Sequence, residues 1–556
     1  MSTELIIGMA GSGGDGIVSA GESMINALAL EGYHGILTKS FGPQIRGGES
    51  SCRLRLSTKP LLHAMGTLDI AVALNWEDFL KFGTELAKQA AGTEKAQNSV
   101  VLGLVSGWLG IAQESLLSGI RKKFTKKGED VLQGNERAFA AGLEFATAHP
   151  LRVSRIMATP ESKSSKFLVD GNDICAAAAI YAGCQFFGGY PITPSTEIMQ
   201  YLNREIWKHG GSVLQAEDEI AGIGACVGAS FAGKKALTAT SGPGMSLKTE
   251  MLGLATIAEL PLVCVNVQRG GPSTGIPTKS EQSDLYQAAF SAHGDVVRPV
   301  LAPISAGDTF GVTVEAFNIA EKYQTPVIIL SDQEIAQRKE TVEPFDPKDF
   351  KLVERMAPNQ AELEHYVRFR YTDTGISPVS HPGMKGGNYL AAGIEHNEHG
   401  DPTAGGETHA KMNDKRIKKL DPLKRRRDLF LIEGDPDAPL ALVSWGSMAG
   451  VVREALQAAR GEGLKVKLLV PKLLYPVAEE IYRDFFRSVQ GGLVVEQSHL
   501  GQLYRLIRMF VDVPKGLESL AKSGSNPIAP AEVATRLREV VQNLQRRLTP
   551  EAESQG

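Results

Sequence analysis

The chain has 556 residues, and domain-size statistics predict about three or four domains rather than a single core. Hydrophobic residues make up 42% of the sequence and charged residues 22%, as in ordinary soluble globular proteins, and the net charge of -4 argues against a general nucleic-acid-binding protein. No apolar run is long and uncharged enough to span a membrane, and the first residues lack the basic-then-apolar pattern of a signal peptide.

The cysteines do not form the closely spaced pairs that bind metals. No two are separated by only two residues, so neither a zinc motif nor a self-contained set of iron–sulfur ligands is visible. We interpret them as buried free thiols of a cytoplasmic protein. They are Cys52, Cys175, Cys184, Cys226 and Cys264.

The N-terminal region begins with a predicted apolar strand, Glu4 to Met9, followed by the glycine-rich segment Gly11 to Gly16 and an amphipathic helix from about Ile17 to Glu31. Main-chain N–H groups of such a loop are suited to phosphate binding, although glycines at this place also serve close packing. Gly14-Asp15-Gly16 does not begin a thiamine diphosphate and magnesium motif, because the following segment KSFGPQIRGGES contains no asparagine pair.

A second loop, Phe41 to Ser50, carries Arg46, which is followed by Gly47 and Gly48. It leads into the alternating strand SCRLRLS, a buried strand LDIAVALNW follows, and helices from Val100 to about Ala148 complete the domain. The segment Pro150 to Lys166 is rich in Ser, Lys and Pro and has weak periodicity, which is typical of a linker.

The segment GGYPITPSTE, Gly188 to Glu197, is predicted to be a stiff loop. Its glycines allow close approach of a ligand, and its two prolines restrict the backbone, so that the Thr193 hydroxyl is held at a defined place. A rigid loop that offers a hydroxyl and main-chain groups suits a binding site. The alternative is an ordinary strand-to-helix turn in which Ser195 or Thr196 is the N-cap.

Glu219 stands where the strand-like SVLQAEDE passes into a helix of Ala, Gly and Cys. A carboxylate beside small residues and little water would act strongly on whatever it contacts. The alternative is a helix N-terminal Glu favoured by the helix dipole, and the neighbouring Glu217 and Asp218 leave the choice of carboxylate open. The following segment ALTATSGPG is a buried strand that ends in a glycine-rich loop.

Arg269 ends the buried strand LPLVCVNVQ and precedes two glycines, Ser273 and Thr274. An arginine at such a strand end suits bidentate binding of a carboxylate, because ligands of open α/β sheets bind at the carboxyl ends of the strands. The alternative is a surface arginine in a salt bridge. TPVIILSD is predicted to be the last strand of this domain.

The last third begins with a segment rich in Pro, Gly and His. The spacings of its four histidines fit no common metal-ligand pattern, and the basic run Lys411 to Arg427 is interpreted as solvated helix faces. From Pro439, strands and helices alternate and predict a small doubly wound sheet, followed by a polar tail from Arg547. The histidines are His381, His396, His399 and His409.

Together these motifs resemble the 2-oxoacid:ferredoxin oxidoreductase family. YPITPSTE, QAEDEIAGIGACVGASFAG, TATSGPG and QRGGPSTGIPTKSEQSDL resemble its α subunit, while GMAGSGGDG and SFGPQIRGGES resemble its γ component, here fused ahead of α. The resemblance covers nearly the whole chain, and the fused γ–α arrangement is most similar to the α subunit of 2-oxoglutarate:ferredoxin oxidoreductases.

The resemblance implies an α/β fold of several doubly wound domains. The expected parts are a γ-type oxidoreductase domain (1–155), a linker (156–168), a pyrimidine-binding thiamine diphosphate domain (169–345), a connecting segment (346–430), a transketolase C-terminal-like domain (431–546) and a tail (547–556).

The activity implied is oxidative decarboxylation of a 2-oxoacid on thiamine diphosphate, with acyl transfer to coenzyme A and electron transfer through iron–sulfur clusters to ferredoxin. For 2-oxoglutarate the products are succinyl-CoA and CO2. The alternatives are a pyruvate or branched-chain 2-oxoacid enzyme, or a non-catalytic scaffold or nucleotide-binding protein with the same fold.

By resemblance, Glu219 is the catalytic glutamate that hydrogen-bonds the cofactor's aminopyrimidine ring and favours the imino tautomer that removes the thiazolium proton. Arg269 would bind the 2-oxoacid carboxylate, and the loop Gly275 to Asp284 would complete the pocket. Lys279 in this loop is either a helper at a distal carboxylate or simply an exposed lysine. The implied substrate-binding residues are Thr193, Arg269, Ser273 and Thr274, and the cofactor-binding residues are Tyr190, Pro191, Ile192, Thr193, Glu219 and Gly242.

The chain lacks the diphosphate and Mg²⁺ signature and clustered cysteines. In the family, Mg²⁺ and a [4Fe-4S] cluster belong to a separate β subunit, so no metal site is expected on this chain. We therefore expect a β partner in an (αβ)₂ assembly, an active site at the α–β interface, ferredoxin as electron acceptor, and no nucleic-acid or membrane partner.

Overall fold

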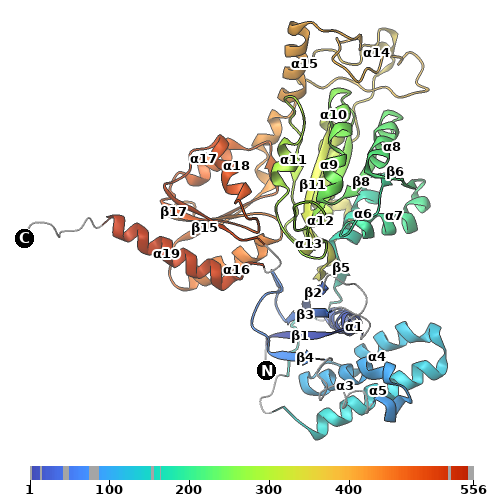
Figure 1. The fold of residues 1–556 in the computed structure, drawn as a ribbon, viewed down its shortest axis with the longest axis vertical. Helices are drawn as coiled ribbons and strands as arrows, with labels where there is room; N and C mark the ends of the chain where they lie inside the picture. Colours follow the sequence, from blue (N-terminus) through green and yellow to red (C-terminus); the bar gives the residue numbers. More distant parts are fainter. Residues whose placement is uncertain are drawn as a thin grey trace, which may run out of the picture. The chain divides into compact units, whose positions relative to one another are not determined.

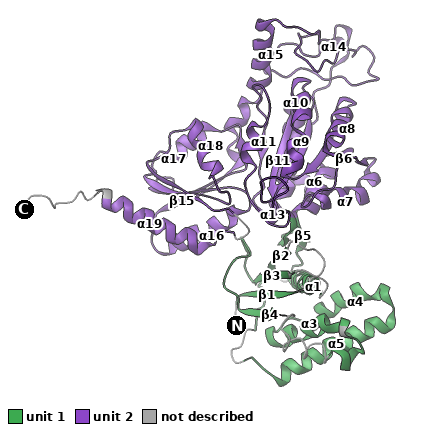
Figure 2. Ribbon diagram, in the orientation of Figure 1, with its two compact units in different colours: residues 1–170, 337–346 green, residues 171–336, 347–556 purple. Residues whose placement is uncertain are grey.

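The computed structural model describes residues 3–12, 16–41, 49–73, 87–151, 156–162, 164–523 and 527–548. Its strands form three sheets, and the chain divides into two compact units (Figure 1 and Figure 2). Unit 1 comprises residues 1–170 and 337–346, and unit 2 comprises residues 171–336 and 347–556. The predicted α/β architecture with several sheets is confirmed. The centre of the glycine-rich loop, residues 13–15, and the loop with Arg46 lie outside the described residues.

Unit 1 contains a six-stranded sheet in the order β4-β1-β3-β2-β12-β5. β3 lies between β1 and β2 and pairs with both in antiparallel register. Only β1 and β4 run parallel. The sheet is therefore mainly antiparallel. Its strands are β1 (Glu4–Ser12), β2 (His34–Phe41), β3 (Glu49–Ser57), β4 (Ile70–Ala73), β5 (Phe167–Val169) and β12 (Lys339–Val342).

α1 (Ile17–Leu30) packs on this sheet, and the other helices of unit 1 pack on α1 and on one another. α1 buries an apolar face, and α3 (Gln97–Leu109) and α5 (Glu129–Ala148) touch through glycines. A Cβ atom added to Gly103 would lie 2.0 Å from the carbonyl oxygen of Phe139, so only glycine permits this approach. The predicted helical region is thus confirmed, with α4 (Gln113–Phe124) and the short η1 (Glu94–Ala96) and η2 (Thr125–Lys127) completing it.

Two short strands bring later parts of the sequence into the sheet of unit 1. β5 begins at Phe167, inside the predicted linker, and pairs with β12, which also pairs with β2. The Thr341 hydroxyl accepts a hydrogen bond from the main-chain N–H of Gly35 at 2.7 Å. Strands of three and four residues are too short for their periodicity to be read from the sequence.

Unit 2 contains a seven-stranded sheet in the order β16-β10-β11-β9-β8-β6-β7, in which only β16 is antiparallel. Its strands are β6 (Phe186–Gly189), β7 (Ser212–Gln215), β8 (Ala236–Thr240), β9 (Leu262–Gln268), β10 (Val300–Leu301), β11 (Pro326–Asp332) and β16 (Leu473–Tyr475). The helices between them are α6 (Gly171–Tyr181), α7 (Thr196–Glu205), η3 (Ile206–His209), α8 (Glu219–Phe231), α9 (Gly242–Leu247), α10 (Thr249–Ile257), α11 (Leu285–Phe290), α12 (Ala306–Tyr323) and α13 (Gln333–Gln337).

The third sheet, also in unit 2, has the order β13-β15-β14-β17-β18 and is parallel except for β13. This is the doubly wound sheet predicted from Pro439 onward. Its elements are β13 (Phe430–Glu433), β14 (Leu440–Ser444), α16 (Met448–Gly461), β15 (Val466–Pro471), α17 (Glu479–Phe486), β17 (Gly491–Glu496), α18 (Gln502–Phe510), β18 (Gly516–Ala521) and α19 (Pro530–Leu548).

One hydrophobic core joins the two sheets of unit 2. It contains Val265 and Ile329 of the seven-stranded sheet together with Trp445 and Val494 of the third sheet. In addition, β16 lies between β15 and β17 in the chain, but it pairs with β10 of the seven-stranded sheet. The two sheets of unit 2 are therefore packed as one body.

The segment between β12 and β13 is attached to unit 2 by a buried cluster of charges. The prediction that the basic run Lys411 to Arg427 forms solvated helix faces is therefore wrong for Lys415 and Lys419, which are buried. The carboxylate of Glu259, fully buried, contacts the Lys415 ammonium at 2.5 Å and the Lys419 ammonium at 2.9 Å, and Arg368 donates to the Glu259 carbonyl at 2.8 Å. Burial would raise the pKa of Glu259, but Lys419 and Lys415 outweigh it and lower the pKa below its usual value. The elements of this segment are η4 (Pro347–Asp349), α14 (Gln360–Glu364), α15 (Gly406–Lys418), η5 (Asp421–Arg425) and η6 (Arg427–Leu429).

The histidines of this segment make separate contacts. His396 packs on the Phe369 ring at 4.1 Å between centroids, and His409 contacts the Glu395 carboxylate at 2.6 Å. In the part of the chain that the structure describes, no three His, Cys, Asp or Glu side chains form a group that could hold a metal ion.

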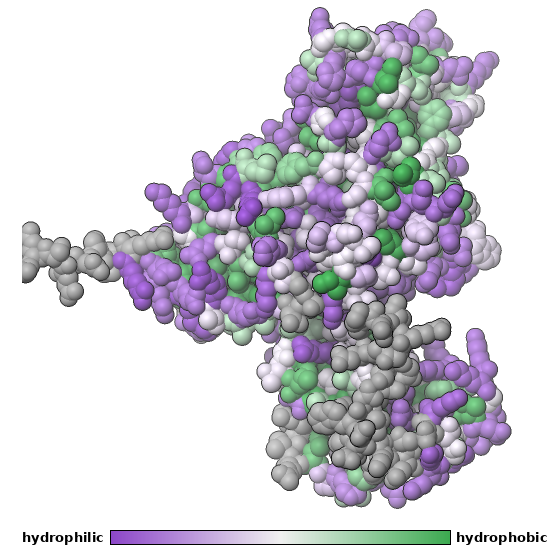
Figure 3. All heavy atoms as spheres, in the orientation of Figure 1, coloured by the Kyte–Doolittle hydropathy of each residue, from purple (hydrophilic) through white to green (hydrophobic). Residues whose placement is uncertain are grey.

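None of the described helices is long and apolar enough to cross a bilayer. The face drawn in Figure 3 carries mostly hydrophilic side chains, with apolar side chains in scattered patches.

We predict that Glu259→Gln destabilises unit 2 by about 3 kcal/mol, because two buried ammonium groups lose their anionic partner. Calorimetry should show a lower Tm for the transition of unit 2. Glu407→Gln removes an exposed ion pair with Lys411 on the same helix and should leave Tm unchanged. Equal Tm values for the two variants would contradict the prediction.

Candidate active site

The predicted site residues follow four neighbouring parallel strands of the seven-stranded sheet. The loop from Tyr190 follows β6, Glu219 begins the helix after β7, Gly242 follows β8, and Arg269 follows β9. Carboxyl ends of parallel strands lie at one edge of a sheet, which is where open α/β sheets bind ligands. The fold therefore brings these segments to one place.

The loop after β6 is held by hydrogen bonds on both sides. The Ser195 hydroxyl donates to the Ile192 carbonyl at 3.0 Å, and the buried Asn172 amide donates to the Pro194 carbonyl at 2.7 Å and to the Glu197 carboxylate at 3.1 Å. Ser195 occupies the N-cap position of α7, but its side chain makes no capping hydrogen bond. The loop is thus fixed by contacts other than the capping interaction of the alternative interpretation.

Arg269 is buried and contacts this loop directly. Its Nη1 donates to the carbonyl of Thr193 at 2.6 Å, and only 7% of the residue is exposed, unlike the surface arginine of the alternative interpretation. Burial lowers the pKa of Arg269, and Asp284 opposes this shift. Its Nε is buried without a hydrogen-bond partner among the described residues. The described residues therefore use only part of the hydrogen-bonding capacity of this guanidinium.

Glu219 is the buried carboxylate of its segment. Asp218 caps α8 by accepting the N–H of Ala221 at 2.8 Å, Glu217 is exposed, and Glu219 is only 7% exposed. A Cβ atom on Gly244 would lie 2.7 Å from the Glu219 Oε1, so this carboxylate lies directly against the backbone of the first turn of α9, the helix after β8. The structure thus separates the roles of the three adjacent acids.

Glycines bring α8 onto the strand beside it. A Cβ atom on Gly222 would lie 2.9 Å from the Cα of Gly189, and one on Gly188 would lie 2.5 Å from the Gly222 carbonyl oxygen. Both contacts are closer than real Cβ atoms show, so helix and strand meet backbone to backbone. This approach places the first turn of α8, with Glu219, beside the loop after β6.

Lys248 is a buried cation beneath Glu219 that the sequence analysis missed. Its ammonium donates to the Glu219 carbonyl at 3.1 Å and to the Thr238 hydroxyl at 3.0 Å, and none of the residue is exposed. Burial lowers the pKa of Lys248. A lysine among small and apolar residues, in SGPGMSLKTE, was the available signal.

Gly242 lies against Asp284, the last residue of the predicted pocket loop, which the sequence did not single out. A Cβ atom on Gly242 would lie 3.0 Å from the Asp284 Oδ2, which accepts a hydrogen bond from Asn266 at 3.0 Å, and Gln268 accepts the Asp284 N–H at 3.0 Å. Burial raises the pKa of Asp284 to about 6. Asn266 and Gln268 are polar residues in an otherwise apolar buried strand, which could have pointed to this polar cluster.

Ser273 and Thr274 lie on an exposed part of the loop after β9. The loop is closed by hydrogen bonds between Gly270 and Lys279 and between Ile276 and Gly270. Among the described residues, no hydrogen bond joins Ser273 or Thr274 to Thr193 or Arg269. The structure thus brings together Thr193, Arg269, Glu219 and Gly242 but leaves these two hydroxyls at the rim.

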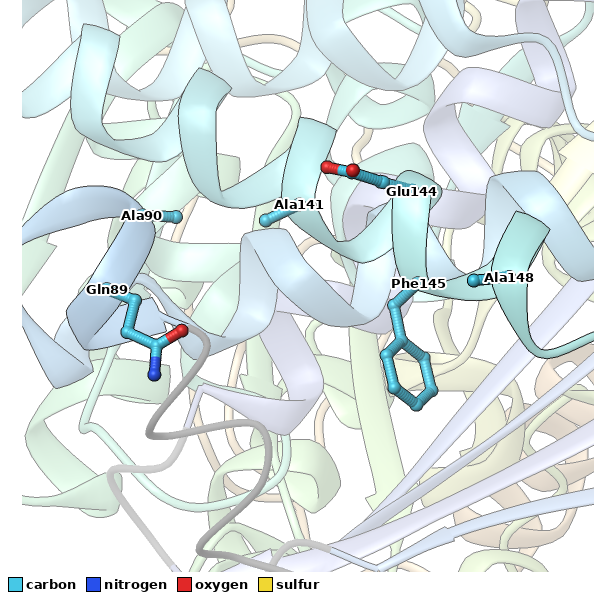
Figure 4. Close-up of a pocket in the computed structure, with 6 residues that line it drawn as sticks. All are labelled: Gln89, Ala90, Ala141, Glu144, Phe145 and Ala148. Atoms are coloured by element: carbon cyan, nitrogen blue, oxygen red, sulfur yellow. The ribbon is translucent and has the colours of Figure 1, made fainter.

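A separate cavity of about 430 Å³ lies in unit 1, beside α5 (Figure 4). It contains none of the predicted site residues. Its lining residues are Gln89, Ala90, Ala141, Glu144, Phe145 and Ala148.

Three family models match successive parts of the chain. The model of pyruvate flavodoxin/ferredoxin oxidoreductase, thiamine diphosphate-binding, matches residues 177–415. The pyruvate ferredoxin/flavodoxin oxidoreductase model matches residues 6–85 and 82–145, and the pyruvate:ferredoxin oxidoreductase core domain II model matches residues 438–533.

Similar proteins agree with these matches. The 2-oxoglutarate synthase subunit KorA of Methanocaldococcus jannaschii is 38% identical over 337 residues, 60% of this chain and 89% of that protein. The 2-oxoglutarate oxidoreductase subunit KorA of Mycobacterium tuberculosis is 35% identical over 472 residues, 81% of this chain and 70% of that protein.

A solved structure of Magnetococcus marinus 2-oxoglutarate:ferredoxin oxidoreductase, with 2-oxoglutarate, coenzyme A and succinyl-CoA bound, matches with a TM-score of 0.92 and 36% identity. The match covers 98% of this chain and 100% of that chain. The chain therefore belongs to the 2-oxoacid:ferredoxin oxidoreductase family, and the resemblance in its motifs is confirmed.

We predict that Gly244→Ala destabilises the protein by about 1–3 kcal/mol, because the new methyl group would displace the Thr240 hydroxyl and the Glu219 carboxylate. Gly253→Ala on α10 meets no atom within 4 Å and should be neutral or slightly stabilising. Thermal unfolding of both variants measures the difference, and a Gly244→Ala protein as stable as wild type would contradict the packing.

The raised pKa of Asp284 predicts a pH dependence of stability. The folded chain keeps this proton at a pH where the unfolded chain has released it, so the contribution of Asp284 to stability falls as pH rises from about 4 to above 6. Asp284→Asn removes this loss. The Tm of Asp284→Asn minus the Tm of wild type should therefore be larger at about pH 8 than at about pH 5, by about 2 °C or more. A constant difference would contradict the prediction.

Proposed function

We propose that this chain is the α subunit, with a fused γ-type domain, of a 2-oxoglutarate:ferredoxin oxidoreductase. The reaction would convert 2-oxoglutarate and coenzyme A to succinyl-CoA and CO2 and pass two electrons to ferredoxin. The observation that carries the proposal is the buried Glu219 carboxylate at the strand edge where Arg269 binds the Thr193 loop. The 2-oxoglutarate enzymes among the similar proteins support the choice of substrate.

The residues around Glu219 fit the pyrimidine end of thiamine diphosphate. A buried carboxylate against the backbone of Gly244 suits a hydrogen bond to a ring nitrogen, and the loop from Tyr190 to Thr193 and Gly242 would line the ring. When bound, thiamine diphosphate supplies the nucleophilic carbon and electron sink that decarboxylation of a 2-oxoacid requires. Glu219 would hold or release the proton it shares with that nitrogen.

The same edge of the sheet would bind the substrate. Arg269 gives one N–H group to the Thr193 carbonyl, and the other N–H groups of its guanidinium would donate to the 2-oxoacid carboxylate. The Thr193 hydroxyl would contact the keto group or carboxylate. Ser273 and Thr274 would reach the substrate from the rim of the site.

We propose that a β subunit covers this edge in an (αβ)₂ assembly and carries Mg²⁺ and a [4Fe-4S] cluster. Large apolar side chains are exposed around the site, which is typical of a surface that a partner covers. These side chains are Tyr190, Leu214, Ile220 and Leu247, which are 42–48% exposed. We also propose the domain limits that the family resemblance implies. The free thiols support a cytoplasmic location.

The test is oxoacid-dependent, coenzyme A-dependent reduction of ferredoxin or a viologen dye by the chain purified with its β partner. The expected result is the highest kcat/KM with 2-oxoglutarate among 2-oxoglutarate, pyruvate and 2-oxoisovalerate. Preference for pyruvate or 2-oxoisovalerate would make the substrate assignment wrong. No reduction with any of the three would make the enzyme assignment wrong and favour a scaffold or nucleotide-binding role.

In this assay Glu219→Gln should lower kcat by about 100-fold or more, because an amide cannot hold and release the proton that the carboxylate shares with the ring nitrogen. Arg269→Ala should mainly raise KM for the oxoacid, by about tenfold or more. Glu217→Gln, at the exposed neighbour of Glu219, is the matched control and should stay near wild type. Near-normal activity of both site variants would mean that the residue assignments are wrong.

A further inference from the structure

The third sheet has the crevice in which doubly wound folds bind their ligands. The chain runs from β14 to β15 on one side and then to β17 on the other side, so the strand order reverses between β14 and β17. Ligands of such sheets bind outside the carboxyl ends of the strands at this reversal. Trp445 directly follows β14, and Gln497 directly follows β17.

In this chain a segment of the protein itself occupies that position. The main-chain N–H of Gln282 donates to the Gln497 carbonyl at 2.7 Å, and the Gln497 N–H donates to the Gln282 Oε1 at 2.8 Å. The Gln282 Nε2 donates to the Trp445 carbonyl at 2.8 Å. Gln282 is fully buried, and a Cβ atom on Gly446 would lie 2.6 Å from its Nε2. The crevice is thus fitted closely around this one side chain.

Further hydrogen bonds hold the residues on either side of Gln282. The Gln497 side chain donates to the Ser280 carbonyl at 3.0 Å. The Gln502 side chain donates to the Ser283 carbonyl at 2.7 Å and accepts the Tyr286 N–H at 2.9 Å. The segment from 280 to 286 is therefore held along its length by residues of the third sheet.

Asp332, at the carboxyl end of β11, connects the same elements. One of its oxygens accepts the Ser280 hydroxyl at 3.3 Å, and the other accepts the Ser447 N–H at 3.2 Å. Carboxyl ends of strands from both sheets of unit 2 thus converge on this segment.

This segment is the second half of the loop that begins with Arg269. Gly270 donates its N–H to the Lys279 carbonyl at 2.9 Å, and Gly271 donates to the Glu281 carboxylate at 3.3 Å. Asp284, two residues after Gln282, lies against Gly242. A shift of Gln282 would therefore move both Arg269 and Asp284, which lies against the cofactor-binding residue Gly242.

We propose that the crevice of the third sheet is a support for the substrate loop, in which Gln282 and Gln497 are positioning residues for Arg269. This rests on the proposed function, since Arg269 is taken to bind the 2-oxoacid carboxylate. The third sheet then contributes to oxoacid affinity through the position of the loop.

The test compares Gln282→Ala, Gln497→Ala and Ser444→Ala. Ser444 is a matched control, because its buried hydroxyl donates to the Val495 carbonyl at 2.8 Å within the third sheet and does not contact the loop. In the complex with the β partner, Gln282→Ala should raise KM for 2-oxoglutarate about fivefold and change kcat less than about twofold. Gln497→Ala removes the hydrogen bond from the Gln497 side chain to the Ser280 carbonyl and should raise KM about twofold.

Hydrogen–deuterium exchange on the full chain gives a readout that does not depend on activity. Peptides covering residues 270–284 should exchange faster in Gln282→Ala and Gln497→Ala, and at the wild-type rate in Ser444→Ala. Loop exchange and KM equal to those of Ser444→Ala in both glutamine variants would overturn the inference. If wild type reduces no acceptor with any oxoacid, the proposed function fails, and faster loop exchange would still support the crevice as a loop support.

Discussion

The contact between α8 and β6 is the constraint on which the candidate site depends. The helix meets the strand backbone to backbone at Gly188, Gly189 and Gly222, and side chains at these positions would push the two apart. Because Glu219 begins this helix, its distance from the loop after β6 is set by that contact. Gly244, in the first turn of α9, encloses Glu219 from the other side. The Glu219 carboxylate is thus buried at this edge because glycines let the backbones of α8 and β6 come into contact.

The polar groups of the site are held by partners from distant parts of the sequence. Arg269 reaches across β8 to the Thr193 carbonyl, and Lys248 bonds the first carbonyl of α8 from beneath. A buried polar group that loses its hydrogen-bond partner is destabilising, because water cannot replace that partner. These buried hydrogen bonds therefore hold Arg269 and α8 in place more strongly than exposed ones would. The shared core of the two sheets in unit 2 gives these contacts a common rigid frame.

Much of this arrangement could be predicted from the sequence, because the informative residues adjoin clear local patterns. The loop after β6, Glu219 and Arg269 each follow a strand that its apolar residues reveal, and the parallel order of the strands brings them together. Gly188 and Gly189, which were predicted to begin this loop, are the last residues of β6. Lys248 was missed and Asp284 was not singled out, because their importance depends on partners far away in the sequence. The short strand β12 was missed for a similar reason, since its pairing partners are far from it in sequence.

The return of β12 to the sheet of unit 1 also affects how the chain can be divided. The chain passes between the units near residues 170, 336 and 346, so unit 1 is built from two separate stretches of sequence. A single cut between residues 156 and 162 would leave β12 paired with β2 and β5, and the two products would stay associated through those strands. A gene that encoded residues 1–155 alone would lack both β5 and β12, and its product would expose the edge of β2.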